Sequence, residues 1–326
     1  MEWQVKSEAE TNPAYGCLPS KRPIVEYLRN GIINVDKVAG PTSRQVADWV
    51  KNIFGASKTG HSGTLDPNVT GVFVVALDNA TKAIHVLLHS PKEYVCLMHL
   101  HEDAPLRDLK TAMKELTGKT YQRPPLRSAV KRVLRVREAY AIDLIEKDGK
   151  AVLFRVSCEA GYYVRKLCHD IGTILGVGAQ MTELRRTRTG PYDEGSIASL
   201  QKLSEAKYLL DTKGDESYLR RLVMPVESAV SMIPKVAVQD SAVGALCNGS
   251  KLMAPGVAKL QRFKKGSTIA LLTLKGELIC LAVAEEGSDK ILKMPKGFCA
   301  KSTRVIMPEG IYPRMWKTQK TKPPDQ

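Results

Sequence analysis

The 326-residue sequence predicts an α+β fold: a larger first domain with a mainly antiparallel mixed sheet, then a small C-terminal β-barrel domain. Up to about residue 230, segments with strand periodicity alternate with single amphipathic helices, without the regular strand–helix–strand repeat that builds a parallel sheet. Beyond residue 230, short apolar runs separated by glycine-containing turns indicate a barrel. The length is sufficient for two domains with separate cores.

The first domain follows an irregular, polar segment of 30 residues that contains three prolines. Thr42 and Ser43 are candidate N-caps for a helix that Gly55 would end. The segments expected to form strands are 32–35, 72–77, 92–100, 129–145 and 151–158. The segments expected to be helical are 46–53, 80–88, 106–116 and 164–175, followed by a charged helical region at 195–230.

The second domain is expected to contain strands at 268–274, 278–284 and 303–307. Pro225 and Pro234 interrupt the chain before it begins. We therefore divide the chain into an N-terminal extension that packs on the C-terminal domain, a first domain, a C-terminal barrel and a basic, disordered tail, at residues 1–30, 31–230, 231–312 and 313–326.

Composition and charge narrow the class of protein. A hydrophobic content of 43% with 25% charged residues is ordinary for a globular protein, and the net charge of +15 favours a polyanionic partner. No run of eighteen apolar residues and no signal-peptide core are present, so we expect an intracellular protein without a membrane segment. The seven cysteines include no Cys-x-x-Cys pair and are expected to be reduced, and no histidine pattern predicts a metal site.

The loop at residues 60–67, with the sequence GHSGTLDP, is the most informative stretch of the chain. Glycines allow positive φ and close approach of another chain, whereas Pro67 restricts the backbone after Asp66. The apolar strand that follows would hold Asp66 on a stiff loop. On spacing alone, a surface turn in which Asp66 bonds to its own backbone is the favoured interpretation.

Three ordered motifs resemble those of the TruB family of pseudouridine synthases, and particularly its archaeal, dyskerin-like branch. The first is GHSGTLDPNVTG at residues 60–71. The second combines CEAG at 158–161 with VRKLCHDIG at 164–172, and the third combines LGVGA at 175–179 with ELRRTRTGP at 183–191. Similar segments extend from about residue 20 to residue 313. IPK at 233–235, DSA at 240–242, NGS at 248–250 and APGV at 254–257 resemble a PUA domain, an RNA-binding module.

This resemblance implies a pseudouridine synthase catalytic domain followed by a PUA domain, with Asp66, Tyr94 and Arg165 as catalytic residues. A carboxylate can attack an electron-poor carbon or stabilise positive charge on the sugar. Arg165 would balance the charge of Asp66 in an apolar pocket, because a guanidinium pairs with carboxylates in a fixed geometry. Tyr94 would stack on the target base and could accept a proton, although a strand tyrosine chosen at random is more often a core residue.

Three further residues match substrate-binding positions of the family. Leu184 matches a position that packs against the base, His61 a histidine that helps to open the RNA loop, and Lys37 a lysine near the floor of the active site. His61 and Lys37 could equally be ordinary surface residues. The resemblance implies no cofactor and no metal.

The predicted function is the isomerisation of uridine to pseudouridine in structured RNA. The substrates implied are the uridine at position 55 in the tRNA T-loop, guide-directed rRNA sites in a box H/ACA ribonucleoprotein (RNP), or both. The partners implied are tRNA, rRNA, H/ACA guide RNA and the small H/ACA RNP proteins, in the cytoplasm of an archaeal cell. The alternative is a non-catalytic RNA-binding scaffold. A hydrolase with paired carboxylates fits less well, because no second acid accompanies Asp66 in its motif.

Overall fold

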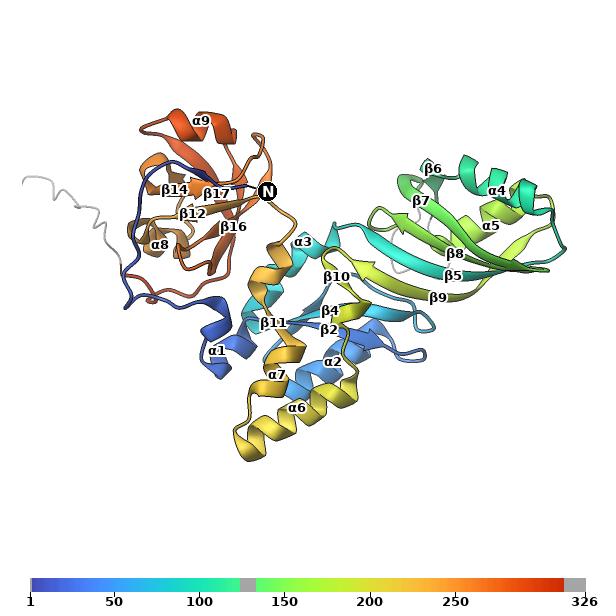
Figure 1. Ribbon diagram of the computed structural model, residues 1–326, viewed down its shortest axis with the longest axis horizontal. Helices are drawn as coiled ribbons and strands as arrows, with labels where there is room; N and C mark the ends of the chain where they lie inside the picture. Colours follow the sequence, from blue (N-terminus) through green and yellow to red (C-terminus); the bar gives the residue numbers. More distant parts are fainter. Residues whose placement is uncertain (1, 124–132, 314–326) are drawn as a thin grey trace, which may run out of the picture. The chain divides into compact units, whose positions relative to one another are not determined.

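Strands and helices form two units in the computed structural model, which describes residues 2–123 and 133–313 (Figure 1). One unit consists of residues 32–77 and 84–224, and the other of residues 1–31, 78–83 and 225–326. The predicted α+β class with mixed sheets is confirmed. Residues 129–132 of a predicted β-rich segment, and all but the first residue of the expected basic tail, lie outside the described residues.

The larger sheet has ten strands, in the order β11-β2-β4-β9-β5-β8-β7-β6, with β3 paired to β4 and β10 paired to β9. Its strands are β2 (Gly31–Lys37), β3 (Thr59–His61), β4 (Thr70–Leu77), β5 (Lys92–Leu100), β6 (Gly118–Gln122), β7 (Arg135–Asp148), β8 (Ala151–Cys158), β9 (Ala179–Thr189), β10 (Tyr192–Asp193) and β11 (Val223–Pro225). The pairing of β4 with β9 is parallel, whereas β5 pairs antiparallel with β8 and β9. The parallel pairing joins two strands, β4 and β9, that are far apart in the sequence.

The helices of this unit follow the predicted apolar stripes in most places. They are α2 (Ser43–Phe54), α3 (Ile84–Leu88), α4 (Leu106–Glu115), α5 (Val164–Ile174), α6 (Leu200–Lys213) and α7 (Ser217–Leu222). Thr42 caps α2 in a capping box with Gln45, and Gly55 ends the helix with a φ of 59°. The buried face of α5 contains Leu167 and Ile171, as its apolar spacing predicts.

Three expectations for secondary structure were wrong. The helix expected at 80–88 is split into a 3-10 turn, η2 (Asp78–Lys82), and the short helix α3. The first residue of η2, Asp78, has a positive φ. The N-terminal segment is not wholly irregular, because it contains β1 (Gln4–Val5), η1 (Pro19–Lys21) and α1 (Ile24–Arg29). Strand β9 was not expected, because its alternating polar residues conceal its apolar face.

The smaller sheet has seven strands, in the order β1-β14-β12-β15-β16-β17-β13. Besides β1 they are β12 (Lys235–Val238), β13 (Leu252–Met253), β14 (Val257–Leu260), β15 (Thr268–Leu272), β16 (Leu278–Ala284) and β17 (Phe298–Val305). The pairing of β12 with β15 is parallel. Besides α1, η1 and η2, the described residues of this unit contain the helices α8 (Asp240–Cys247) and α9 (Ser288–Lys293) and the 3-10 turns η4 (Val226–Val230) and η5 (Ala254–Gly256).

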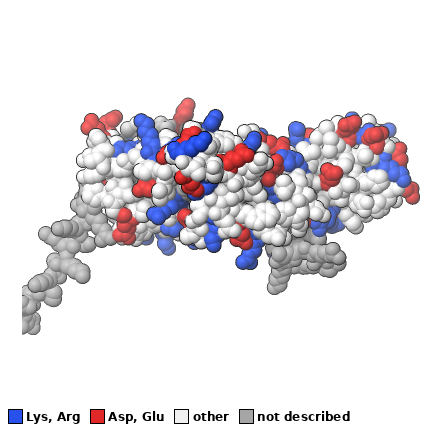
Figure 2. Space-filling view, turned by 90° about the horizontal axis from the view of Figure 1, so that it is seen from below, with Lys and Arg blue, Asp and Glu red and all other residues white. Residues whose placement is uncertain are grey.

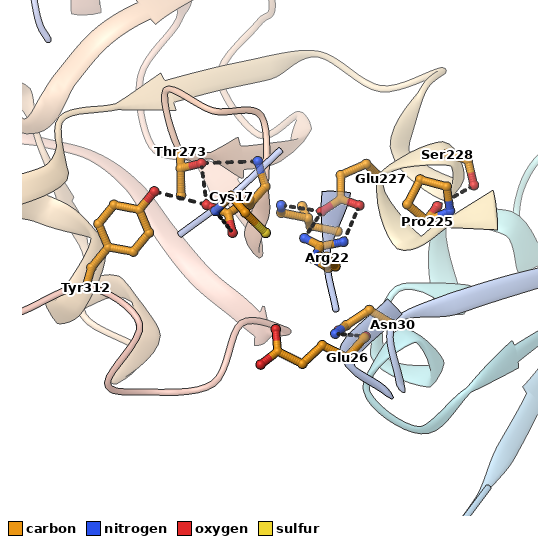
Figure 3. Close-up of polar contacts among 11 residues, drawn as sticks. Cys17, Arg22, Glu26, Asn30, Pro225, Glu227, Ser228, Thr273 and Tyr312 are labelled. Atoms are coloured by element: carbon orange, nitrogen blue, oxygen red, sulfur yellow. Dashed lines mark hydrogen bonds and ion pairs between the residues drawn. The ribbon is translucent and has the colours of Figure 1, made fainter. Parts of the chain in front are cut away.

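Buried polar contacts attach the N-terminal segment to the rest of the smaller unit (Figure 3). The Arg22 guanidinium donates two hydrogen bonds to the Glu227 carboxylate, at 2.6 and 2.9 Å. Glu227 also accepts a hydrogen bond from the backbone amide of Leu278 at 2.7 Å. The buried Glu277 accepts bonds from the backbone amide of Cys17 and from the hydroxyl of Tyr312. These carboxylates therefore need their partners in the folded state.

We predict that Arg22→Ala destabilises the folded chain by about 3–5 kcal/mol, because it leaves the Glu227 carboxylate buried without its cation. Urea unfolding followed by circular dichroism measures this change. The matched control is Arg44→Ala, since the Arg44 side chain is 92% exposed and lies 3.9 Å from Asp48. Equal effects of the two substitutions would show that the buried pair contributes no more than a surface pair.

Candidate active site

A cavity of about 430 Å³ opens between the loop that carries Asp66, strands β5 and β9, and the start of α5. Four of the six predicted site residues line it, namely Asp66, Tyr94, Arg165 and Leu184. Lys92 and Arg186, which the prediction did not include as site residues, also line it. The motifs that are separated along the chain thus meet at one cavity.

The backbone of the Asp66 loop is fixed by hydrogen bonds from neighbouring elements. The Ser43 hydroxyl, in the first turn of α2, bonds to both the amide and the carbonyl of Leu65 at 2.8 Å. The Lys37 ammonium donates to the carbonyls of Pro67 and Val69 at 2.8 and 2.9 Å. Because these partners belong to α2 and β2, the loop has the stiffness that its sequence predicts.

The Asp66 carboxylate contacts the Arg165 guanidinium, which comes from the first turn of α5. This arrangement differs from a simple surface turn, because the side chain bonds across 99 residues of sequence. The Asp66 and Arg165 side chains are 53% and 45% exposed, respectively. The expectation of an apolar pocket around this pair was therefore wrong for the protein without RNA: water reaches the pair.

Tyr94 is placed by the alternation of β5. Cys96, Met98 and Leu100 follow it on the same face and are fully buried, whereas Tyr94 lines the cavity at the start of that row. Burial raises the pKa of the Tyr94 phenol, and the nearby Arg186 guanidinium acts in the opposite direction. The site thus brings a phenol into the cavity beside a carboxylate and two guanidinium groups.

The other three predicted residues differ in their environments. Leu184 lines the cavity and lies opposite Cys96 in the pairing of β9 with β5. His61 is half-buried with its ring 5.2 Å from that of Phe73, and it does not line the cavity. Burial lowers the pKa of His61. Lys37 is fully buried beneath the loop, so the interpretation of Lys37 as an ordinary surface residue was wrong.

Arg186 and Lys92 were not among the predicted site residues, although both line the cavity. Both side chains are buried, with 1% and 5% exposure. The Lys92 ammonium donates to three backbone carbonyls, those of Leu87, Leu88 and Ser90, and burial lowers its pKa to about 7. For Arg186 the available signal was its place in the third motif, and for Lys92 it was a charged residue at the start of a mainly apolar strand.

Basic and acidic side chains are mixed on one face of the protein (Figure 2). On the face in Figure 2, Lys and Arg side chains are interspersed with Asp and Glu and do not gather into one patch. Within residues 2–123 and 133–313, no three His, Cys, Asp or Glu side chains are grouped so that they could hold a metal ion. No helix in the same residues is long and apolar enough to cross a membrane.

Family comparisons match the chain in consecutive segments. Residues 1–47 match the DKCLD (NUC011) domain, and residues 51–164 match the N-terminal domain of the TruB family pseudouridylate synthases. Residues 165–231 match the C-terminal domain of tRNA pseudouridylate synthase B, and residues 234–306 match the PUA domain.

Similar proteins cover almost the whole chain. A probable tRNA pseudouridine synthase B from Methanosarcina barkeri is 52% identical over 312 residues, which are 95% of this chain and 92% of that protein. The protein of the same description from Archaeoglobus fulgidus is 49% identical over 315 residues, with 96% and 97% covered.

Solved structures agree with these relatives. The chain resembles a protein in a Cbf5–Nop10–Gar1 complex with a TM-score of 0.91 and 48% identity, covering 96% of each chain. It resembles one in an H/ACA RNP bound to a substrate RNA containing 2′-deoxyuridine with a TM-score of 0.91 and 45% identity, covering 97% of each chain. Conserved architecture and sequence over nearly the full length establish that this chain belongs to the TruB family of pseudouridine synthases, with a C-terminal PUA domain.

Proposed function

We propose that this enzyme isomerises uridine to pseudouridine in two RNA settings: the T-loop of tRNA, and guide-directed rRNA sites where it is the catalytic subunit of a box H/ACA RNP. The tRNA setting is supported by relatives described as tRNA pseudouridine synthase B. The RNP setting is supported by solved relatives in complexes with Nop10, with Gar1 and with substrate RNA. Its partners would then be tRNA, rRNA, guide RNA and the small H/ACA proteins, in the archaeal cytoplasm.

The observation that carries the proposal is the contact between Asp66 and Arg165 at a cavity that Tyr94 and Leu184 also line. Pseudouridine formation breaks the bond between C1′ of the ribose and N1 of uracil and makes a bond between C1′ and C5. Asp66 would supply negative charge at the reacting sugar or base, whether by attack on C1′, by attack on C6 or by driving a glycal route. The Arg165 guanidinium would orient that carboxylate and balance its charge.

The remaining residues would bind the base. Moving uridine out of its stack costs a few kcal/mol, and an aromatic surface recovers part of that cost. Tyr94 would supply this surface and Leu184 would pack on the base. His61 would contact the opened RNA loop, whereas the buried Lys37 would act by holding the Asp66 loop.

We propose that each segment of the chain has the function that the sequence predicts for it. Residues 31–230 would carry the reaction, residues 231–312 would bind RNA, and residues 1–30 would support the PUA domain. The alternative of a non-catalytic scaffold requires that the same folded chain bind RNA without converting it. Conversion of uridine to pseudouridine, in a tRNA transcript and in an rRNA fragment with and without guide RNA, separates these functions.

We predict that Asp66→Asn lowers turnover by several orders of magnitude, because the amide keeps the size of the side chain but removes its negative charge. Tritium release from C5-labelled uridine measures turnover, and filter binding measures RNA affinity, which should stay close to that of the wild type. Turnover within about tenfold of wild type would refute the role of Asp66 as the reacting carboxylate.

We predict that Arg165→Ala lowers the single-turnover rate by orders of magnitude but changes the free energy of unfolding by only about 0–1 kcal/mol, because the ion pair is half-exposed before RNA binds. RNA would cover the pair and make its loss costly in the transition state. Arg165→Lys should restore only part of the rate, since lysine lacks the planar fork.

The matched control is Lys166→Ala, which removes a neighbouring cation on α5 that pairs with Asp170 instead of Asp66. Its single-turnover rate should stay close to that of the wild type. If Arg165→Ala lowered stability and left the single-turnover rate unchanged, the arginine would be a structural residue.

A further inference from the structure

A β-bulge brings Arg186 opposite Tyr94. In the antiparallel pairing of β5 with β9, Glu93 lies opposite Arg188, and regular pairing would place Thr187 opposite Tyr94. The register instead shifts between Glu93 and Tyr94, so that Arg186 becomes the cross-strand partner of Tyr94. Bulges near active sites redirect side chains in this way, and here the bulge exchanges a threonine for an arginine on the cavity face.

Arg186 is held in this position by backbone groups of neighbouring elements. Its Nε donates to the carbonyl of Val72 at 2.7 Å, and its Nη2 donates to the carbonyl of Gly63 at 3.3 Å. The strands approach closely at this point, because a Cβ on Gly71 would lie 2.2 Å from the carbonyl oxygen of Arg186. The guanidinium therefore connects β9 with β4 and with the loop that carries Asp66.

The charge of Arg186 has no carboxylate partner among the described residues. The only acidic residue that lines the cavity is Asp66, which contacts Arg165 instead. The other charged group beside it on β5, Lys92, has the same sign. Burying a cation without a counter-charge is costly, so its retention here points to an anion that forms during the reaction.

Tyr94 is the group beside Arg186 that can become that anion. Its cross-strand neighbour on the other side, β8, is the apolar Val156. Around it, burial, Cys158 on β8 and Asp66 raise the pKa of the phenol, whereas the nearby Arg186 guanidinium lowers it. Arg186 is thus the nearby group that favours the phenolate over the phenol.

We propose that Arg186 is a positioning residue for Tyr94, which holds the phenol at the cavity and stabilises its phenolate while Tyr94 shuttles a proton between two atoms of the uracil. This inference rests on the proposed function and on the role of Tyr94 in it. The C1′–N1 bond breaks with its electron pair on N1, and the Tyr94 hydroxyl gives its proton to N1. After the bond between C1′ and C5 forms, the C5 proton passes to the phenolate, so Tyr94 is regenerated and the base is an isomer.

A double-mutant cycle in the full-length protein tests this coupling. Single-turnover rates at saturating RNA are measured for the wild type, Arg186→Met, Tyr94→Phe and the double variant. Arg186→Met should slow the wild type by about 10²-fold, as removal of one preorganised donor does elsewhere. It should slow Tyr94→Phe by no more than about threefold, since the group on which it acts is then absent. An equal slowing in both backgrounds would overturn the proposal.

A chemical rescue provides a second measurement that a merely structural role would not affect. Incorporation of 3,5-difluorotyrosine at position 94 makes the phenol more acidic and should recover about tenfold of the rate that Arg186→Met loses. If the rate does not recover, the proposal is overturned. This test still applies if Tyr94→Phe reacts too slowly for the double-mutant cycle to be measured. If Arg186→Met fails to fold, the cycle and rescue are carried out with Arg186→Lys, which keeps the charge but loses the fork.

The controls separate this inference from the proposed function. Arg188→Met removes an exposed arginine from the same strand, where it lies 3.7 Å from Asp193, and its rate should stay within about threefold of the wild type. Conversion by the wild type, and its loss in Asp66→Asn, test the proposed function in the same assay. A wild-type rate for Tyr94→Phe would overturn this inference while leaving pseudouridine formation intact.

Discussion

The contact between Asp66 and Arg165 is the interaction on which the organisation of the site depends. Asp66 belongs to the loop between β3 and β4, and Arg165 belongs to the first turn of α5, so the contact joins the first motif to the second. The parallel pairing of β4 with β9 brings the third motif to the same place. A cavity bounded by all three motifs follows from these two connections.

Holding a reacting carboxylate at a solvent-exposed position requires that the backbone, and not burial of the side chain, provide the rigidity. In this protein the Asp66 side chain remains half-exposed, while the backbone on both sides of it is bonded to Ser43 and Lys37. The hydroxyl and the ammonium are themselves buried. Their hydrogen bonds to the chain keep the loop in place without shielding the carboxylate from the RNA that must reach it.

Much of the fold could be predicted, because local signals and tertiary packing agree. The capping residues and apolar spacing of α2 predicted its ends, and the alternation of β5 predicted the row of buried residues beyond Tyr94. The failures have physical causes. Strand β9 carries several charged residues, so its apolar periodicity is weak, and its pairing with β4 depends on contacts more than 100 residues apart.

Asp66, Tyr94, Arg165 and Leu184 could be found from motif resemblance, and they meet at the cavity. Arg186 was in the third motif, but its place opposite Tyr94 depends on a bulge, which periodicity cannot reveal because one extra residue reverses the faces of a strand. Likewise, composition and periodicity do not distinguish a surface lysine from Lys37 or Lys92, whose charges are buried among backbone carbonyls. For Lys37, only the motif resemblance pointed to the site.

The cavity is surrounded by more cations than carboxylates, an arrangement that costs folding stability. Lys92, Arg165 and Arg186 line it with Asp66 as their single acidic counterpart, and Lys37 lies beneath the loop. Lys37, Lys92 and Arg186 donate hydrogen bonds to backbone carbonyls. Burial, with a smaller contribution from the Arg186 charge, lowers the pKa of Lys37, His61 and Lys92. Mutual repulsion of this kind would be selected against in an ordinary core. The same positive charge becomes favourable when RNA, a polyanion, covers the site and excludes water from it. Negative charge then develops as the base is detached, and the fixed cations stabilise it without having to reorient.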